Sequence, residues 1–240
     1  MRGVTVEPLS PPPPAGVVVL YSDIGCPWGS LAVHRLRRRR AERGLDDEVR
    51  IDHRAFPLEL FNEQVTPKTI VDSEVAVVGS HEPDLAWRPW SRKEREYPST
   101  TLLPLEAVQA AKAEAVGGLR ASEDLDAALR SAWYADSRSI HLWSELLAIA
   151  AELPTVDADA LAARLRDGAG RAEVFAQWDE SKRHAQGSPH LHLTDGTSVH
   201  NPGITLEWTD QQFAGMPRIA ADDVGTYDDL LDRAGRLSAS

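Results

Sequence analysis

The stretch VVVLYSDIGCPWG, residues 17–29, decides the fold of this chain. Its first five residues are β-branched or bulky and apolar on both faces, which is typical of a central strand in a parallel sheet. A helix is predicted from there to about Arg43, because apolar residues continue at helical spacing and Gly44 suits the position after a helix end. The one cysteine of the chain, Cys26, therefore falls where a buried strand gives way to a helix.

Further elements are predicted on both sides of a long middle segment. Residues 49–56 alternate in polarity as a strand does, and strand, helix and strand over about 40 residues indicate a right-handed βαβ unit. Near the C-terminus, Asp195-Gly196 between two short alternating runs predicts a hairpin, and a last helix is expected over roughly 222–236. With the middle removed, the predicted order is βαβ–ββα.

The chain therefore divides into three parts. Residues 1–16 are expected to be a flexible proline-rich arm, because Pro11 to Pro14 favour extended geometry. Residues 17–60 and 187–240 form the core domain. Residues 61–186 are an inserted segment, which we expect to be irregular to about 104 and α-helical after that.

Composition excludes several classes of function. The 240 residues carry 26 basic and 37 acidic side chains, a net charge of −11, so neither a nucleic-acid partner nor an anionic membrane surface is expected. The arginine run 37–40 is interpreted as a solvated helix face. The N-terminus lacks the apolar segment of a secretory signal, and a single cysteine forms no internal disulfide, so we expect a cytoplasmic protein.

No metal site is expected. The four histidines His184, His190, His192 and His200 lie near one another in the sequence, but their spacing matches no established zinc signature.

Cys26 is the candidate for chemistry. A thiol at the N-terminus of a helix faces unpaired N–H groups and the positive end of the helix dipole, which lowers its pKa and makes it a nucleophile. Pro27 suits the first helical turn, and Trp28 is expected beside the sulfur as a shield or a binding wall. The alternative is that Cys26 is a small buried apolar side chain, which is the usual role of a lone cysteine.

Ser188-Pro189 is the second candidate. X-Pro bonds are cis in about 5–6% of folded cases, so trans is the default expectation. A cis bond here would present the Ser188 backbone as an edge for an extended ligand.

Together, these residues resemble a known family. Ser22-Asp23-Ile24-Gly25-Cys26-Pro27-Trp28 is similar to the active-site turn of DsbA-like thioredoxin-fold proteins, in particular to their cytosolic branch with S-D-x-x-C-P-W-C. Ala55-Phe56-Pro57-Leu58 and Gly187-Ser188-Pro189 also resemble stretches of that branch. The resemblance implies an α/β fold, a thioredoxin-like core with an α-helical insertion domain. It further implies that Cys26 is the attacking thiol, that Pro189 is a cis-proline against it, and that the Ser188 backbone pairs with substrate.

One position departs from the family pattern. Gly29 stands where the family has its second cysteine, which resolves the mixed disulfide internally. We therefore expect a thiol–disulfide oxidoreductase that uses Cys26 alone, with an external thiol completing the cycle. Its partners are a thiol or disulfide substrate, either a small molecule or a protein, and a homodimer is possible.

Two alternatives stay open. The kappa-class glutathione transferases and hydroxychromene-carboxylate isomerases are also similar, which implies a transferase or isomerase dependent on glutathione or another low-molecular-weight thiol. No tightly bound cofactor is expected, and Ser22 and Asp23 are candidates to touch such a thiol only because they are near it in the sequence. The second alternative is a non-catalytic binding module with a degenerate thioredoxin fold.

Overall fold

A computed structural model describes residues 6–210 and 215–236 of the chain. Its central sheet has the strand order β2-β1-β3-β4, in which β1 runs parallel to β2 and antiparallel to β3, and β4 is antiparallel to β3. The predicted βαβ–ββα core is confirmed. Its elements are β1 (Val17–Ser22), α1 (Pro27–Glu42), β2 (Arg50–Ala55), β3 (His190–His192), β4 (Ser198–His200) and α9 (Gly225–Arg236).

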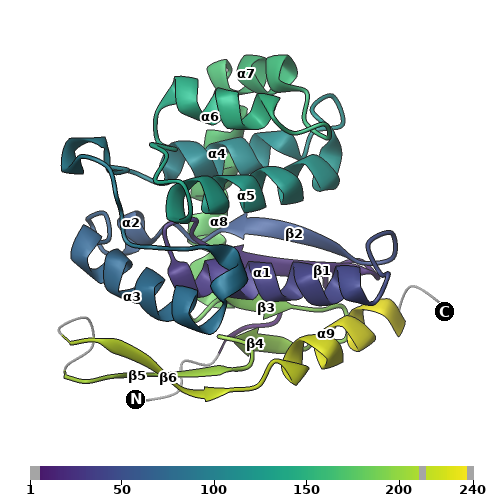
Figure 1. Ribbon diagram of the computed structural model, residues 1–240. Helices are drawn as coiled ribbons and strands as arrows, with labels where there is room; N and C mark the ends of the chain where they lie inside the picture. Colours follow the sequence, from purple (N-terminus) through teal and green to yellow (C-terminus); the bar gives the residue numbers. More distant parts are fainter. Residues whose placement is uncertain (1–5, 211–214, 237–240) are drawn as a thin grey trace.

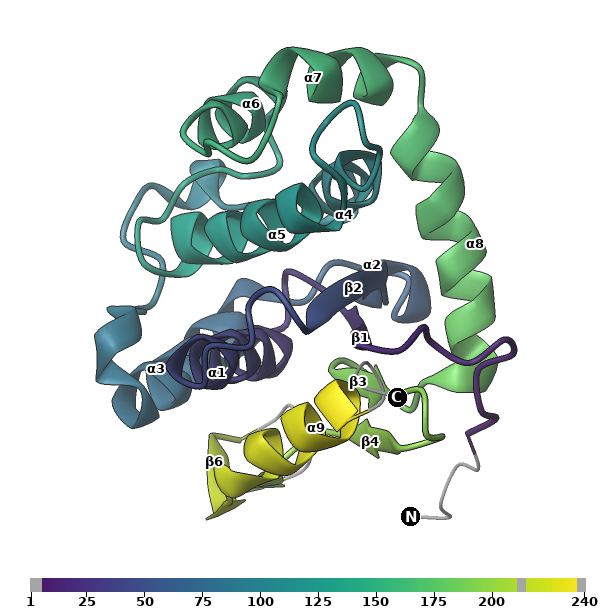
Figure 2. The same ribbon diagram turned by 90° about the vertical axis from the view of Figure 1, so that its right-hand side faces the viewer.

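Alternation along β1 assigns its side chains to two faces of the sheet. Val18 and Leu20 pack with Leu36 of α1 and Leu231 of α9, so these two helices cover one face. Figure 2 shows α1 and α9 together on one side of the sheet and α8 on the other.

The opposite face of β1 is covered partly by the N-terminal segment. Val19 and Tyr21 pack against Leu9, which is buried, and the Glu7 N–H donates to the Arg183 carbonyl at 3.0 Å. The prediction of a flexible arm is therefore wrong for residues 6–16, because Leu9 covers apolar surface of β1; residues 1–5 lie outside the described residues.

The helical insertion follows β2. Four of its helices form a layer above the sheet, and α8 runs from that layer back along the sheet to β3 (Figures 1 and 2). The helices are α4 (Leu102–Ala111), α5 (Gly118–Tyr134), α6 (Trp143–Ala151), α7 (Ala158–Arg166) and α8 (Ala169–His184).

The expectation of an irregular segment to about 104 is wrong. Val71, Val75 and Val78 are buried at helical spacing in one helix that packs on α1. The prolines and aromatic residues around this helix conceal its periodicity in the sequence. The helical elements of this segment are α2 (Leu58–Phe61), α3 (Lys68–His81), η1 (Pro83–Leu85) and η2 (Glu94–Glu96).

Two further differences concern strands and arginines. A second, two-stranded sheet that the sequence did not indicate pairs β5 (Ile204–Trp208) with β6 (Pro217–Asp222). The arginine run is not a solvated face throughout, because Arg40 is 4% exposed and pairs with the buried Glu123 of α5 at 2.7 Å. Within the described ranges, no helix has the length and apolar character that crossing a membrane requires.

Candidate active site

Cys26 is the N-cap residue of α1, at the end of the turn that follows β1. Its backbone is extended (φ −99°, ψ 109°), and its sulfur accepts a hydrogen bond from the Gly29 N–H at 3.3 Å. Pro27 occupies the first helical position, where its missing N–H costs nothing. The local sequence therefore builds the strand-to-helix junction that the pattern predicts.

The Ser188–Pro189 junction lies directly against this turn. Tyr21 of β1 pairs with His190 of β3, which brings the residues before β3 to the end of β1. The Ser188–Pro189 peptide bond is cis, and the Cys26 thiol donates to the Ser188 carbonyl at 3.2 Å. Two segments 162 residues apart in the sequence thus meet at the sulfur.

The Cys26 sulfur is buried, and this overturns the expected ionisation. The residue is 6% exposed, and burial raises the pKa of its thiol to about 12, with the negative charge of Glu74 acting in the same direction. The hydrogen bond that the sulfur accepts from the Gly29 N–H favours the thiolate but is outweighed by burial. The prediction of a lowered pKa is therefore wrong for this conformation, in which Cys26 is a neutral thiol at pH 7.

A buried carboxyl group that the sequence analysis missed is near enough for its charge to raise the pKa of the thiol. Glu74 of α3 is 4% exposed and accepts a hydrogen bond from the Trp28 indole N–H at 2.9 Å. Burial raises the pKa of Glu74 to about 7. The signal was in the sequence, because Glu74 lies at helical spacing from Val71 and Val78 on the buried face.

Pro27 and Trp28 remain predictions as substrate-contacting residues. Both are buried in this conformation, and the Trp28 indole is tied to Glu74. The Trp28 side chain is 5% exposed and belongs to the same apolar cluster as Cys26, so it helps to keep solvent from the sulfur.

Ser22 and Asp23 hold the turn from inside. The Asp23 carboxylate accepts from the N–H groups of Gly25 and Leu58, both at 2.7 Å, and from the Thr101 hydroxyl at 3.2 Å. Burial is the main reason that the pKa of Asp23 rises to about 6. Both side chains are buried and bonded within the protein in this conformation, and their contact with a small thiol stays a prediction.

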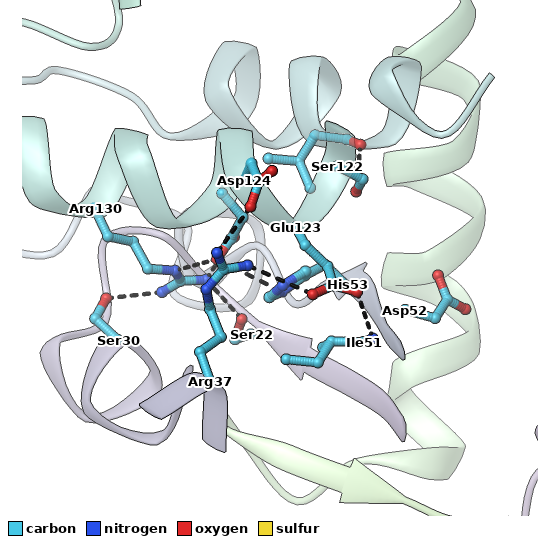
Figure 3. A network of polar contacts seen from close by, with 12 residues as sticks. Ser22, Ser30, Arg37, Ile51, Asp52, His53, Ser122, Glu123, Asp124 and Arg130 are labelled. Carbon is cyan, nitrogen blue, oxygen red and sulfur yellow. Dashed lines mark hydrogen bonds and ion pairs between the residues drawn. The ribbon is translucent and has the colours of Figure 1, made fainter. Parts of the chain in front are cut away.

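Arg130 of α5 links the turn to the inserted helices (Figure 3). Its guanidinium donates to the Asp23 carbonyl at 2.9 Å and to the hydroxyls of Ser22 and Ser30 at 2.8 and 2.7 Å. Its charge is balanced by Asp126, which it contacts through two nitrogens at 2.7 and 2.9 Å. Sequence reasoning missed this residue, since an i,i+4 acid–base pair is more typical of a solvated helix face.

The histidines around β3 contact one another and the backbone. The rings of His190 and His192 lie tilted against each other with centroids 4.8 Å apart, and the His192 Nε2 contacts the His184 carbonyl at 2.7 Å. In the part of the chain that the structure describes, no three acidic, cysteine or histidine side chains are arranged to hold a metal ion.

Known structures share this architecture. A probable DsbA oxidoreductase from Streptomyces coelicolor matches with a TM-score of 0.62 at 22% identity, covering 91% of this chain and 89% of that chain. The cytosolic disulfide reductase DsbM from Pseudomonas aeruginosa matches with a TM-score of 0.55 at 19% identity, covering 93% of this chain and 95% of that chain. The same protein has also been solved with GSH. A 2-hydroxychromene-2-carboxylate isomerase matches at 0.53 and 15%, covering 76% and 87%.

No protein-family model and no curated protein matches the sequence. The structural similarities extend over most of the chain and include both the core and the inserted helices. The chain therefore has the fold of the DsbA-like proteins, a thioredoxin-like core interrupted by an α-helical insertion.

Proposed function

We propose that this protein is a thiol–disulfide oxidoreductase of the DsbA-like type that works through Cys26 alone. The observation that carries the proposal is the position of the Cys26 sulfur, at the first turn of α1 and 3.2 Å from the Ser188 carbonyl. This arrangement gives the sulfur two polar neighbours, an N–H donor from the helix and a backbone edge on which an extended ligand can pair.

The reaction is a two-step exchange. The Cys26 thiolate attacks one sulfur of a substrate disulfide, forms a mixed disulfide with it and releases the other sulfur as a thiolate, which takes up a proton. The thiolate of a second, external thiol then attacks the substrate sulfur of the mixed disulfide and frees Cys26. The sum is an exchange between one thiol and one disulfide, so it needs no further oxidant.

The burial of Cys26 sets a condition on this reaction. A thiol with a pKa of about 12 is almost entirely protonated at pH 7. The reacting state is therefore one in which the sulfur is more exposed than in this conformation. Reaction rates should rise continuously with pH from 6 to 9 and show no plateau in that range.

We further propose a cytoplasmic location and a low-molecular-weight thiol as the external partner. One cysteine needs no oxidising compartment, and the similar Pseudomonas protein is described as cytosolic and has been solved with GSH. A homodimer remains a prediction.

Mass spectrometry of the intact protein tests the proposal. After incubation with glutathione disulfide, a single adduct on Cys26 is expected, and added thiol should remove it. The Cys26→Ser variant is the control and should carry none. An unmodified wild-type protein after prolonged incubation at pH 9 would refute the proposal.

The neutral, buried thiol favours a second candidate, a transferase or isomerase that binds a small thiol without covalent attack by Cys26. In that case Cys26→Ser keeps turnover with an electrophilic substrate, whereas the oxidoreductase loses all exchange activity. If neither adduct nor turnover nor thiol binding is found, the non-catalytic binding module is the remaining reading.

A further inference from the structure

Gly29 leaves a space that the side chain of Ser188 uses. A Cβ atom built on Gly29 would lie 2.9 Å from the Ser188 Oγ, closer than Cβ atoms approach other atoms in proteins. The next neighbours of that Cβ would be the Ser22 Cβ at 3.3 Å and the Asp23 carbonyl oxygen at 3.5 Å. A side chain at position 29 would therefore force the Ser188 hydroxyl out of the position that it holds in this conformation.

The Ser188 hydroxyl has a defined task in that space. Its Oγ accepts the Asp23 N–H at 2.9 Å, while the carbonyl of the same residue accepts the Cys26 thiol at 3.2 Å. Asp23 lies near the start of the turn and Cys26 at its end. Ser188 is thus bonded to both ends of the turn that carries the sulfur.

We propose that Gly29 and Ser188 form a matched pair that commits the site to chemistry with one thiol. Ser188 is the positioning residue of this pair. Its hydroxyl binds the Asp23 N–H and so holds the Cys26 turn in place, and it occupies the space into which a resolving cysteine at position 29 would project. The inference rests on the proposed function and adds to it the reason why the external partner is required.

The two resolution routes make the difference concrete. With a cysteine at position 29, its thiolate would attack the Cys26 sulfur of the mixed disulfide and expel the substrate thiolate, leaving a disulfide between positions 26 and 29. Two electrons would then pass from the protein to the substrate. With glycine at 29, the substrate sulfur stays on Cys26 until a second thiol arrives.

The pair predicts how substitutions combine. Gly29→Cys alone must displace the Ser188 hydroxyl and break its bond to Asp23, whereas Gly29→Cys with Ser188→Ala removes the obstructing oxygen. After addition of oxidised dithiothreitol, we expect the 26–29 disulfide to form about tenfold faster in the double variant, since contacting residues couple with this order of magnitude. Equal rates in the two variants would overturn the proposal.

A second set of single and double variants, made with alanine, tests the pair if the cysteine variants do not fold. Gly29→Ala is expected to lower the melting temperature by about 5 °C, the size of a small overpacking penalty in a chain of this length, and much less when Ser188 is already alanine. Gly25→Ala is the matched control, because its added Cβ meets Thr101 Cγ2 at 2.9 Å, and Ser188→Ala should not relieve it. Additive effects of Gly29→Ala and Ser188→Ala would overturn the pairing.

The positioning role has its own readout. Ser188→Ala alone should speed alkylation of Cys26 about fivefold, the rate equivalent of one lost hydrogen bond that held the turn closed. A purely structural Ser188 would lower the melting temperature and leave the alkylation rate unchanged, which would refute the role. None of these measurements uses a substrate, so they can fail while the mixed disulfide with glutathione forms, or succeed while it does not.

Discussion

Replacing Arg130 by leucine tests whether the buried ion pair supports the active-site turn. The side chains of Arg130 and Asp126 are each 2% exposed, and the arginine makes five hydrogen bonds to the turn, to Ser30 and to Asp126. The substitution leaves the Asp126 carboxylate buried without its counter-charge, which costs about 3–5 kcal/mol in comparable cases. We expect Arg130→Leu to lower the free energy of unfolding by about 4 kcal/mol, much of the 5–15 kcal/mol typical of a folded domain.

Urea unfolding followed by tryptophan fluorescence measures this loss at pH 7 and at pH 5. The deficit should shrink at pH 5, because proton uptake by Asp126, or by His53 Nδ1 at 3.6 Å from it, neutralises the stranded charge. The double variant Arg130→Leu with Asp126→Leu should recover more than half of the loss, since it leaves no unpaired charge.

The control is Arg233→Leu, which removes a half-exposed arginine paired with Asp195 at 3.2 Å. Its effect should stay below about 1 kcal/mol, as for other surface pairs. The reasoning fails if Arg130→Leu is as mild as this control, or if the double variant is no more stable than the single one.

Three further predictions follow from buried groups. Glu74→Gln should speed alkylation of Cys26 at pH 8 by about tenfold, one pKa unit, because it removes the negative charge that opposes the thiolate; a slower reaction would contradict this. Burial lowers the pKa of His190 to about 3, whereas in the unfolded chain this histidine binds a proton below about pH 6.5. The free energy of unfolding should therefore be highest above pH 6.5 and fall by up to about 1.4 kcal/mol per pH unit below it. His190→Gln should flatten this pH dependence. Gly170→Ala should cost about 1–3 kcal/mol, because its Cβ would lie 2.0 Å from the Glu106 carbonyl oxygen; an unchanged urea midpoint would exclude this contact.

The core of the fold is readable from the sequence because its signals are local. The apolar run of β1, the glycine after α1 and the Asp195-Gly196 turn each act over a few residues, and together they predict the βαβ–ββα order. The helix α3 was not predicted because the prolines and aromatic residues around it conceal the helical spacing of its buried valines.

The environment of Cys26 could not be read in the same way. The strand-to-helix junction and the nearby Ser188 follow from sequence and resemblance, and the structure brings them together. How deeply Cys26 is buried depends on how Trp28 and the helix α3 pack around it, and no local sequence pattern encodes that packing. The sign of the pKa shift was therefore wrong although the position of the sulfur was right.

The separation of 162 residues between Cys26 and Ser188 also has a consequence for how the molecule is made. Cys26 is synthesised long before the Ser188–Pro189 junction that contacts it, so the nascent chain carries an incompletely covered thiol through most of translation. Because the sulfur is buried in the finished protein, its reaction with a pulse of alkylating reagent should slow in steps as the segments that surround it are made, and the last step should follow the arrival of Ser188. The single cysteine can therefore report, through its alkylation rate, on the order in which the protein folds during synthesis.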